Sequence, residues 1–275
     1  MTAAAAPRSP CFAMPAGATD CHFHVYDNDP RFPAHKMDMA LALHRRLGIG
    51  RGILVQALPE SRAVSLQGLA LAGPNYRAIT PILEVPSEKE IAALHEAGFR
   101  GVRFGFTQGR HGAPPDIATM RATVERIAPL GWHSDFFFGS AQGLIDMADF
   151  LRALPVPFVV DAMGRIDVGQ GLEQPGFLAL LDLVRRDHGW VKLAGSDRHT
   201  EAGPPYHEAL PFARALIAAA PDRVIWGTDW PHPNNPWNPD DVDLVDLIPL
   251  MTPDPGQQRK LLVDNPARLV GFAPA

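Results

Sequence analysis

"RGILVQALPESRAVSLQGLALAGPNYRAITPILEV", residues 51–85, places a helical segment between two short apolar runs. The runs at 51–57 and 78–85 are continuously apolar for most of their length, which is typical of strands buried on both faces. The segment 61–72 between them has the length of a helix. A strand, a helix and a second strand in this order predict two parallel strands joined by a crossover helix.

The same alternation continues along the rest of the chain. Further strands are expected at 18–25, 99–106, 131–138, 157–162, 189–195 and 222–230, and further helices at 116–129, 142–153, 175–187, 207–219, 241–250 and 255–270. One more helix is expected after Ser87, which has Glu90 three residues later as a capping box. About eight such units predict an α/β fold, a (β/α)8 TIM barrel in a single domain over residues 16–275. A doubly wound sheet is the alternative, but no strand is followed by a glycine-rich dinucleotide motif.

Composition narrows the classes of function. The formal net charge of -5 disfavours nucleic acid as a partner, because phosphate binding needs clustered Lys and Arg. No apolar run reaches the roughly 18 residues of a membrane span. The two cysteines, Cys11 and Cys21, suggest no disulfide framework and fit a cytoplasmic location. Residues 1–15 are expected to form a flexible arm rather than a signal peptide.

Ionisable residues gather where the expected strands end, which is where a barrel of this kind carries its chemistry. In chain order these are His22, His24, Arg103, His133, Asp135, Asp161, Arg165, Ser196, Asp197, Arg198, Asp229 and His232. Buried charge is costly unless it is paired or functional. The clustering therefore predicts a polar site at one end of the barrel.

The stretch "TDCHFHVYD", residues 19–27, sets His22 and His24 one residue apart on an expected strand. Alternate strand residues share a face, so both can point into the barrel while Cys21, Phe23 and Val25 face the helices. The simple alternative is two histidines that only pack.

Asp229 lies in "VIWGTDWPHP", residues 224–233, at the end of an apolar strand. There it can act as a general base towards water or as a metal ligand. The alternative is an N-cap before Pro231.

Other residues have structural explanations beside functional ones. Arg165 can form a salt bridge with Asp167 or Asp135 instead of binding a substrate, and Asp161 can support the site from beneath. His133 and Asp135 alternate and can face the pocket, although the reverse register would point Trp132 and Phe136 there instead.

The motifs "DCHFHVYD", "RGVRF", "GWH", "MGRIDV", "SDR" and "RVIWGTDWPHPN" occur in this order from about Pro15 to Leu269. Together they resemble the amidohydrolase superfamily, and within it the 2-pyrone-4,6-dicarboxylate lactonase branch. The H-x-H pair alone is a weak signal, whereas H-x-H with "WGTDWPHP" in the same order is specific.

The resemblance implies a distorted barrel that hydrolyses a carboxylated lactone, a carboxylic ester, in the catabolism of aromatic or sugar acids. It implies that Asp229 activates water and that His22 and His24 polarise the carbonyl. The residues expected to bind the substrate are Arg103, Arg198, His232, Phe137 and Arg165. Catalysis without a cofactor is expected, and the alternative is zinc or another divalent metal on His22, His24 and Asp229. The partner is then a small anionic lactone, and the oligomeric state stays undetermined.

Several positions depart from the lactonase pattern. Ala162 stands where that pattern has a histidine, and an alanine can neither bind a metal nor donate to an oxyanion. Phe137 replaces a tyrosine, Leu58 replaces a serine, and a basic residue is displaced from Gly109 to Arg110. Altered chemistry, compensation by His133 or Asp135, and an engineered inactivating change all explain Ala162.

Two other activities fit the same scaffold. One is lactone isomerisation and the other is metal-dependent decarboxylation. An inactive variant that only binds its ligand is the third alternative.

Overall fold

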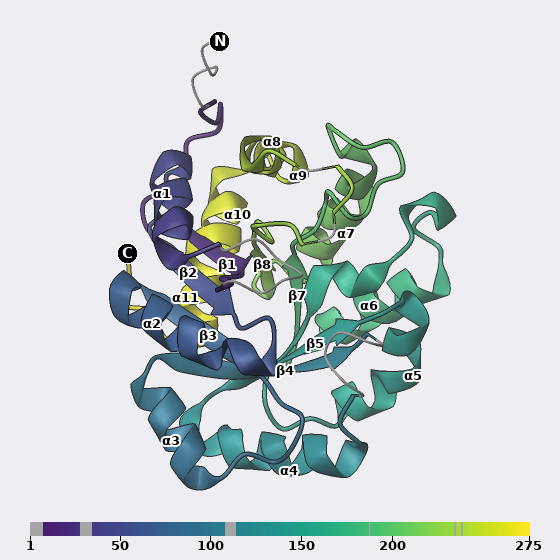
Figure 1. The fold of residues 1–275 in the computed structure, drawn as a ribbon. Coiled ribbons are helices and arrows are strands. Elements are labelled where there is room, and N and C mark those ends of the chain that lie inside the picture. Colours follow the sequence, from purple (N-terminus) through teal and green to yellow (C-terminus); the bar gives the residue numbers. More distant parts are fainter. Residues whose placement is uncertain (1–7, 28–34, 108–113, 187, 234, 238) are drawn as a thin grey trace.

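The computed structural model describes residues 8–27, 35–107, 114–186, 188–233, 235–237 and 239–275. Within them, eight strands pair in parallel and in chain order, and helices surround the strands (Figure 1). The strands are β1 (Thr19–Phe23), β2 (Arg51–Val55), β3 (Tyr76–Pro81), β4 (Phe99–Phe106), β5 (His133–Phe138), β6 (Phe158–Val160), β7 (Gly189–Leu193) and β8 (Val224–Trp226). The expected single-domain (β/α)8 barrel is confirmed.

The helices follow the expected positions closely. They are α1 (Met37–Leu47), α2 (Arg62–Ala72), α3 (Glu88–Glu96), α4 (Ile117–Ile127), α5 (Ala141–Arg152), α6 (Pro175–Arg185), α7 (Leu210–Ala219), α8 (Asp241–Asp246), α9 (Ile248–Met251), α10 (Pro255–Arg259) and α11 (Asn265–Val270). The expected cap of α3 is present, since Ser87 Oγ accepts a hydrogen bond from Glu90 N at 3.2 Å. Helix α1 is an addition that the sequence pattern did not predict.

Most strands are shorter than expected at their carboxyl ends. The expected strand 222–230 keeps ladder pairing only over Val224–Trp226. Beyond it the backbone turns, and Asp229 adopts a left-handed φ of 66°. The residues lost from the ladders form the loops that carry most of the polar side chains named above.

The strict alternation expected for the first strand is wrong at Cys21, which does not pack with Phe23 and Val25. Phe23 and Val25 pack in the large core that the strands share with the helices, as expected. Cys21 instead packs with Ile53 and Ile225 in a separate cluster. The cause is a register shift of β1 against β2 between Asp20 and Phe23, which adds a residue to one side of the ladder.

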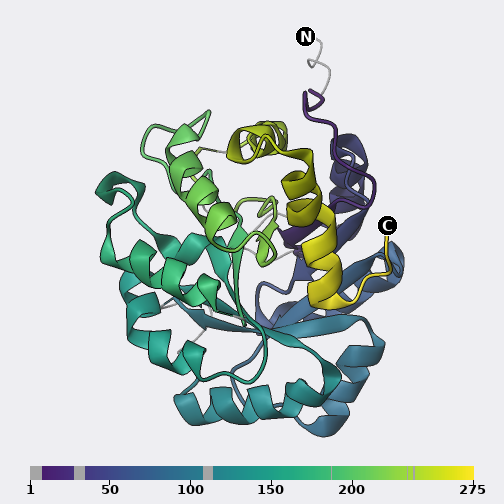
Figure 2. The same ribbon diagram turned by 180° about the vertical axis from the view of Figure 1, so that it is seen from behind.

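The first and the last helices of the chain lie on the same side of the barrel. Helices α10 and α11 pack near α1, which brings the last helices beside the first (Figure 2). From Arg8 on, the expected arm is described: Arg8 pairs with Asp243 at 2.8 Å, and the N–H groups of Cys11 and Phe12 donate to Asp246 Oδ1. These contacts attach residues 8–12 to α8.

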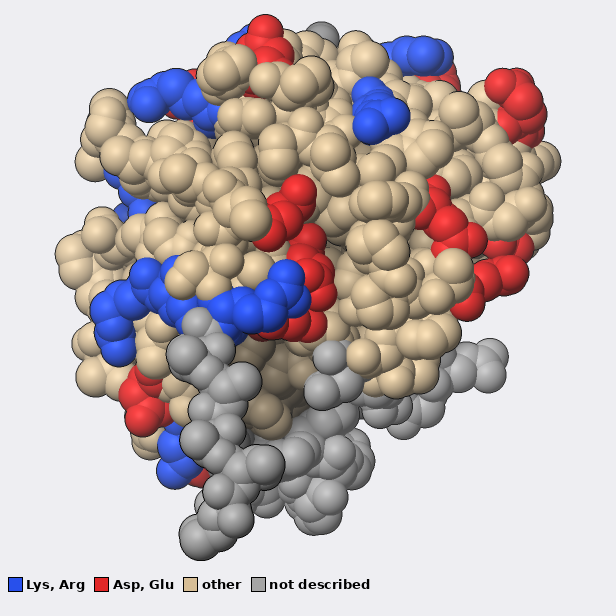
Figure 3. Space-filling model, turned by 90° about the horizontal axis from the view of Figure 1, so that it is seen from above, with Lys and Arg blue, Asp and Glu red and all other residues tan. Residues whose placement is uncertain are grey.

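No helix in the described ranges has the length and apolarity needed to cross a bilayer. On the face seen from above, the basic side chains lie beside acidic ones and much of the surface is uncharged (Figure 3). Among the described residues, that view shows a short band of basic side chains with acidic ones beside it, not the extended basic face that binds phosphate backbones.

Candidate active site

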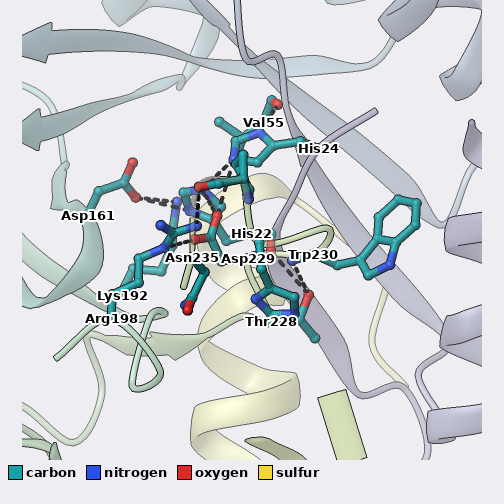
Figure 4. A network of polar contacts seen from close by, with 12 residues as sticks. His22, His24, Val55, Asp161, Lys192, Arg198, Thr228, Asp229, Trp230 and Asn235 are labelled. Atoms are coloured by element: carbon teal, nitrogen blue, oxygen red, sulfur yellow. Dashed lines mark hydrogen bonds and ion pairs between the residues drawn. The ribbon is translucent and has the colours of Figure 1, made fainter. Parts of the chain in front are cut away.

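Three polar side chains meet where β1 and β8 end. His22 lies on β1, His24 follows that strand, and Asp229 follows β8. The two imidazole Nε2 atoms are 3.3 Å apart, and Asp229 Oδ1 lies 3.5 Å from His22 Nε2 and 3.3 Å from His24 Nε2 (Figure 4). All three residues are buried. The structure thus brings together the three residues that the sequence singles out for catalysis.

Backbone contacts between β1 and the loop after β8 hold this arrangement. Asp229 N donates to His22 O at 2.7 Å, and His24 N donates to Trp230 O at 2.8 Å. The close approach requires a glycine at 227, because a Cβ there would lie 2.5 Å from His22 N. The distance between Asp229 and the histidines is therefore set by the backbone.

Asp20 reinforces the same junction from a buried position. Its Oδ1 accepts hydrogen bonds from the N–H groups of His22 and Thr228, and its Oδ2 accepts one from Thr228 Oγ1 at 2.6 Å. His44 Nε2 lies 3.1 Å from the same Oδ2, and the other ring nitrogen of His44 lies 2.9 Å from the Tyr76 hydroxyl. The sequence analysis did not predict this network; the signal was the aspartate at position 20, two residues before His22 on the same strand.

Asp229 is held as a carboxylate. Burial alone would raise its pKa, but the Arg198 guanidinium and the neighbouring His24 and His22 hold that pKa well below its usual range. Arg198 Nε lies 2.5 Å from Asp229 Oδ2. One carboxylate oxygen thus binds the guanidinium, and the other faces the two imidazoles.

The contacts beneath the two histidine rings differ, although both Nε2 atoms face the same point. His24 Nδ1 lies 2.8 Å from the Val55 carbonyl oxygen, so this nitrogen carries a proton and donates it. His22 Nδ1 lies 3.4 Å from Asp161 Oδ1. Two lone pairs cannot face each other at 3.3 Å without a positive group between them. Either a shared proton or a cation therefore belongs between these nitrogens.

The same three residues fit a divalent cation. His22, His24 and Asp229 form a possible metal-binding group whose ligand atoms lie within 4.8 Å of one another. A tetrahedral zinc site with bonds of about 2.0–2.1 Å has ligand atoms about 3.3–3.4 Å apart, close to the distances given above. Two histidines and a carboxylate are also a known ligand set for catalytic zinc, with water in the fourth position.

Beneath the histidines lies a set of paired charges that we call the floor cluster: Arg103, Asp135, Asp161 and Lys192. Lys192 Nζ lies 2.7 Å from both Asp135 Oδ2 and Asp161 Oδ1, and Arg103 Nε donates to Asp161 Oδ2 at 2.9 Å. Burial alone would lower the pKa of Lys192, but the two carboxylates raise it to about 12. The sequence reading missed Lys192; the signal was a lysine in the middle of the apolar run "GWVKLAG".

The contacts of His133 and Asp135 show which side chains in and around β5 face the inside of the barrel. His133 Nε2 lies 3.2 Å from Asp135 Oδ1, and both side chains are buried. Trp132 faces the helices, where its indole N–H donates to His95 Nδ1 at 2.9 Å. Phe136 also packs in the core shared with the helices. His133 contacts Asp135, and Asp135 also binds Lys192.

Arg103 occupies the site's small pocket. Its guanidinium carbon lies 4.5 Å from the centre of the Phe137 ring, and its Nε binds Asp161. The pocket beside it is lined by Pro81, Ile82, Leu83, Arg103, Gly105 and Pro115. A guanidinium in an apolar pocket suits a carboxylate, because its terminal N–H groups can bind both oxygens.

The loop after β6 carries Ala162 and Arg165 in left-handed conformations, with φ values of 44° and 56°. His199 supports this loop, with its ring nitrogens 2.8 Å from Ala162 O and 3.0 Å from Ile166 O. Among the described ion pairs, Arg165 makes none with Asp167 or Asp135, so that structural explanation is wrong. Its guanidinium lies 6.0 Å from the Phe137 ring centre, beside the site.

Four further positions were singled out from the sequence: His232, Leu58, Gly109 and Arg110. His232 is buried, and both its ring nitrogens face carboxylates. Leu58 is buried and packs with Tyr26 and Ala57. Gly109 and Arg110 lie outside the described residues.

Sequence comparison agrees with this arrangement. The amidohydrolase family model matches residues 19–272, which include both histidines and Asp229. The chain belongs to the amidohydrolase family. The family resemblance expected from the sequence motifs is thereby confirmed.

Three curated relatives are similar to this chain over nearly its whole length. The chain is 38% identical to the 2-pyrone-4,6-dicarboxylate hydrolase of Comamonas testosteroni, over 96% of this chain and 93% of the relative. It is 34% identical to the 4-sulfomuconolactone hydrolase of Hydrogenophaga intermedia, over 94% and 90% of the two chains. It is 29% identical to the D-galactarolactone isomerase of Agrobacterium fabrum, over 95% and 94%.

Proposed function

We propose that this enzyme hydrolyses a small lactone that carries one or more anionic groups. The observation that carries the proposal is the carboxylate of Asp229, held ionised by Arg198 with its free oxygen 3.3 to 3.5 Å from two imidazoles. Two of the relatives are named as hydrolases of anionic lactones.

In this mechanism Asp229 removes a proton from water as the water attacks the lactone carbonyl. The carbonyl oxygen becomes an oxyanion beside Nε2 of His22, because the ring proton of His24 lies on Nδ1 and is bound to the Val55 carbonyl oxygen. The ester bond then breaks, and the proton on Asp229 passes to the departing ring oxygen. The products are a hydroxy acid and the regenerated carboxylate.

Three arginines surround the reacting groups and support the choice of an anionic substrate. Arg103 presents its guanidinium in the small pocket over Phe137. Arg165 lies beside that ring, and Arg198, from the loop after β7, binds Asp229 and Pro233 O in the loop after β8.

We propose that hydrolysis proceeds without a metal. Arg198 already balances the charge of Asp229, so a divalent cation would meet two neutral rings and a neutralised carboxylate. If one binds, His22, His24 and Asp229 would hold it, and it would supply Lewis-acid polarisation of the carbonyl. We also propose a cytoplasmic location, in keeping with two free cysteines.

A panel of lactones tests the proposal. Carboxylated or sulfonated lactones should be opened, and uncharged lactones of the same ring should react far more slowly, because they lack the groups that the arginines bind. Proton NMR of the products identifies the ring-opened acid. If no anionic lactone is hydrolysed, the proposal is wrong.

Lactone isomerisation is the second candidate, favoured by the galactarolactone isomerase among the relatives. An isomerase would return a lactone whose acyl group has moved to another hydroxyl. The same NMR spectra separate this product from the opened acid. An inactive variant would give neither product, and an Ala162→His change would then restore turnover.

A further inference from the structure

His232 sits between two buried carboxylates. Its Nδ1 lies 3.2 Å from Asp197 Oδ2, and its Nε2 lies 3.0 Å from Asp241 Oδ1. The His232 side chain is only 6% exposed, and those of Asp197 and Asp241 are 0% and 7% exposed. Both ring nitrogens therefore have protein partners.

The two carboxylates favour a ring with protons on both nitrogens. Nε2 makes a hydrogen bond with Asp241, and Nδ1 faces Asp197 at an ion-pair distance of 3.2 Å. Both nitrogens therefore face protein carboxylates, and neither is available to a substrate. The lactonase resemblance assigns His232 to substrate contact, and this geometry favours a different role.

The residues around His232 join the loop after β7 to the loop after β8. Asp197 also accepts a hydrogen bond from Asn235 Nδ2 at 2.5 Å. The next residue, Arg198, binds Asp229 through Nε and donates from Nη2 to Pro233 O at 3.1 Å. Four contacts thus connect two short segments, residues 197–198 and 229–235.

The second loop needs this support. Asp229 and His232 both have left-handed backbones, with φ values of 66° and 58°, and His232 N donates to Asp229 O at 2.8 Å. Such conformations cost roughly 1–3 kcal/mol each and persist only when surrounding contacts hold them. Through Asp197 and Asp241, His232 ties this strained turn to the loop after β7 and to α8. We call these two contacts the His232 clamp.

We propose that His232 is a positioning residue, which holds the loop of Asp229 against Arg198 through Asp197 and Asp241 and does not bind the substrate itself. The inference rests on the proposed role of Asp229 as the base. It predicts that Asp241, on α8 behind the ring, matters for turnover as well.

Kinetics of two variants test this role. His232→Gln should lower kcat by about 10-fold to 100-fold, since small misplacements of a reacting group have effects of this size. Asp241→Asn should lower kcat by a smaller factor, and the KM for the lactone should stay within about twofold in both. Asp243→Asn is the matched control on the same helix, since Asp243 pairs with Arg8 outside the site, and it should behave as wild type.

One kinetic pattern would contradict the positioning role of His232. If His232→Gln raises KM with kcat unchanged, and Asp241→Asn is indistinguishable from wild type, His232 contacts the substrate directly and the proposal is wrong.

A readout without substrate separates this inference from the proposed function. Proton NMR of the wild-type enzyme at neutral pH should show two downfield ring N–H signals that vanish in His232→Gln, and Asp241→Asn should shift one of them. If these signals are present but no lactone is hydrolysed, the clamp stands and the proposed function fails. If fewer than two are present, the clamp itself is wrong.

Discussion

The floor cluster and the loops above it hold their charges in different ways. In the floor cluster, two cations and two carboxylates lie on or directly after strands and bind one another at 2.7 to 2.9 Å. In the loops after β6 and β8, five of the six described non-glycine residues with left-handed φ are found. The charged side chains of the floor cluster are held in place by the strand register and by an oppositely charged partner. The reactive groups above also need a strained backbone that other contacts must maintain.

The largest effect should come from removing the base in the loop. Asp229→Asn should lower kcat by about 10²- to 10⁴-fold, because an amide cannot accept the proton from water. Asparagine tolerates the left-handed backbone, so the fold should persist, as circular dichroism would show. Asp222→Asn, at an exposed aspartate just before β8, is the matched control. Near-normal turnover by Asp229→Asn would exclude Asp229 as the base.

The next effect should come from the floor cluster, and it should appear in stability. Lys192→Met leaves Asp135 and Asp161 buried without their shared cation, which should lower the free energy of unfolding by about 3–5 kcal/mol. Urea denaturation measures this loss. Lys260→Met, which breaks an exposed pair with Asp222, should cost at most about 1 kcal/mol. Equal losses in the two variants would contradict the contrast between the floor cluster and the surface.

A smaller effect concerns the pH dependence of stability. The pKa of Asp229 lies well below its usual value in the folded protein, so its pairing with Arg198 stabilises the fold at pH values above the usual carboxyl range. That contribution should disappear as the pH falls through the lowered pKa. Thermal melts of wild type and Asp229→Asn should therefore differ near neutral pH and converge in strong acid. A constant difference would show that Asp229 is not paired as a carboxylate.

The smallest effect is expected from metal removal. If a shared proton lies between His22 and His24, dialysis against a chelator should change hydrolysis by less than about twofold. Elemental analysis of the same sample reports whether a metal was bound. Loss of activity on chelation, with recovery on adding zinc, would make the three residues a metal site.

Much of the site was predictable because strand positions are readable from sequence. His22, His24 and Asp229 follow apolar runs, and parallel strands end at the same edge of a barrel. Lys192 and Asp20 were missed because a single polar residue within an apolar run does not reveal its partners. Those partners lie on β5 and α1 and in the segments after β6 and β8, which are distant in sequence.

The sequence by itself predicted the barrel and the three residues, His22, His24 and Asp229, that meet at the strand ends, because hydrophobic periodicity and strand ends are local properties. Only the tertiary structure decided which charges neutralise one another. It showed that Arg198 binds Asp229, that His232 lies between Asp197 and Asp241, and that Arg165 pairs with neither expected aspartate. Such pairings depend on the angles at which loops leave the strands, and left-handed turns set those angles through contacts between distant segments.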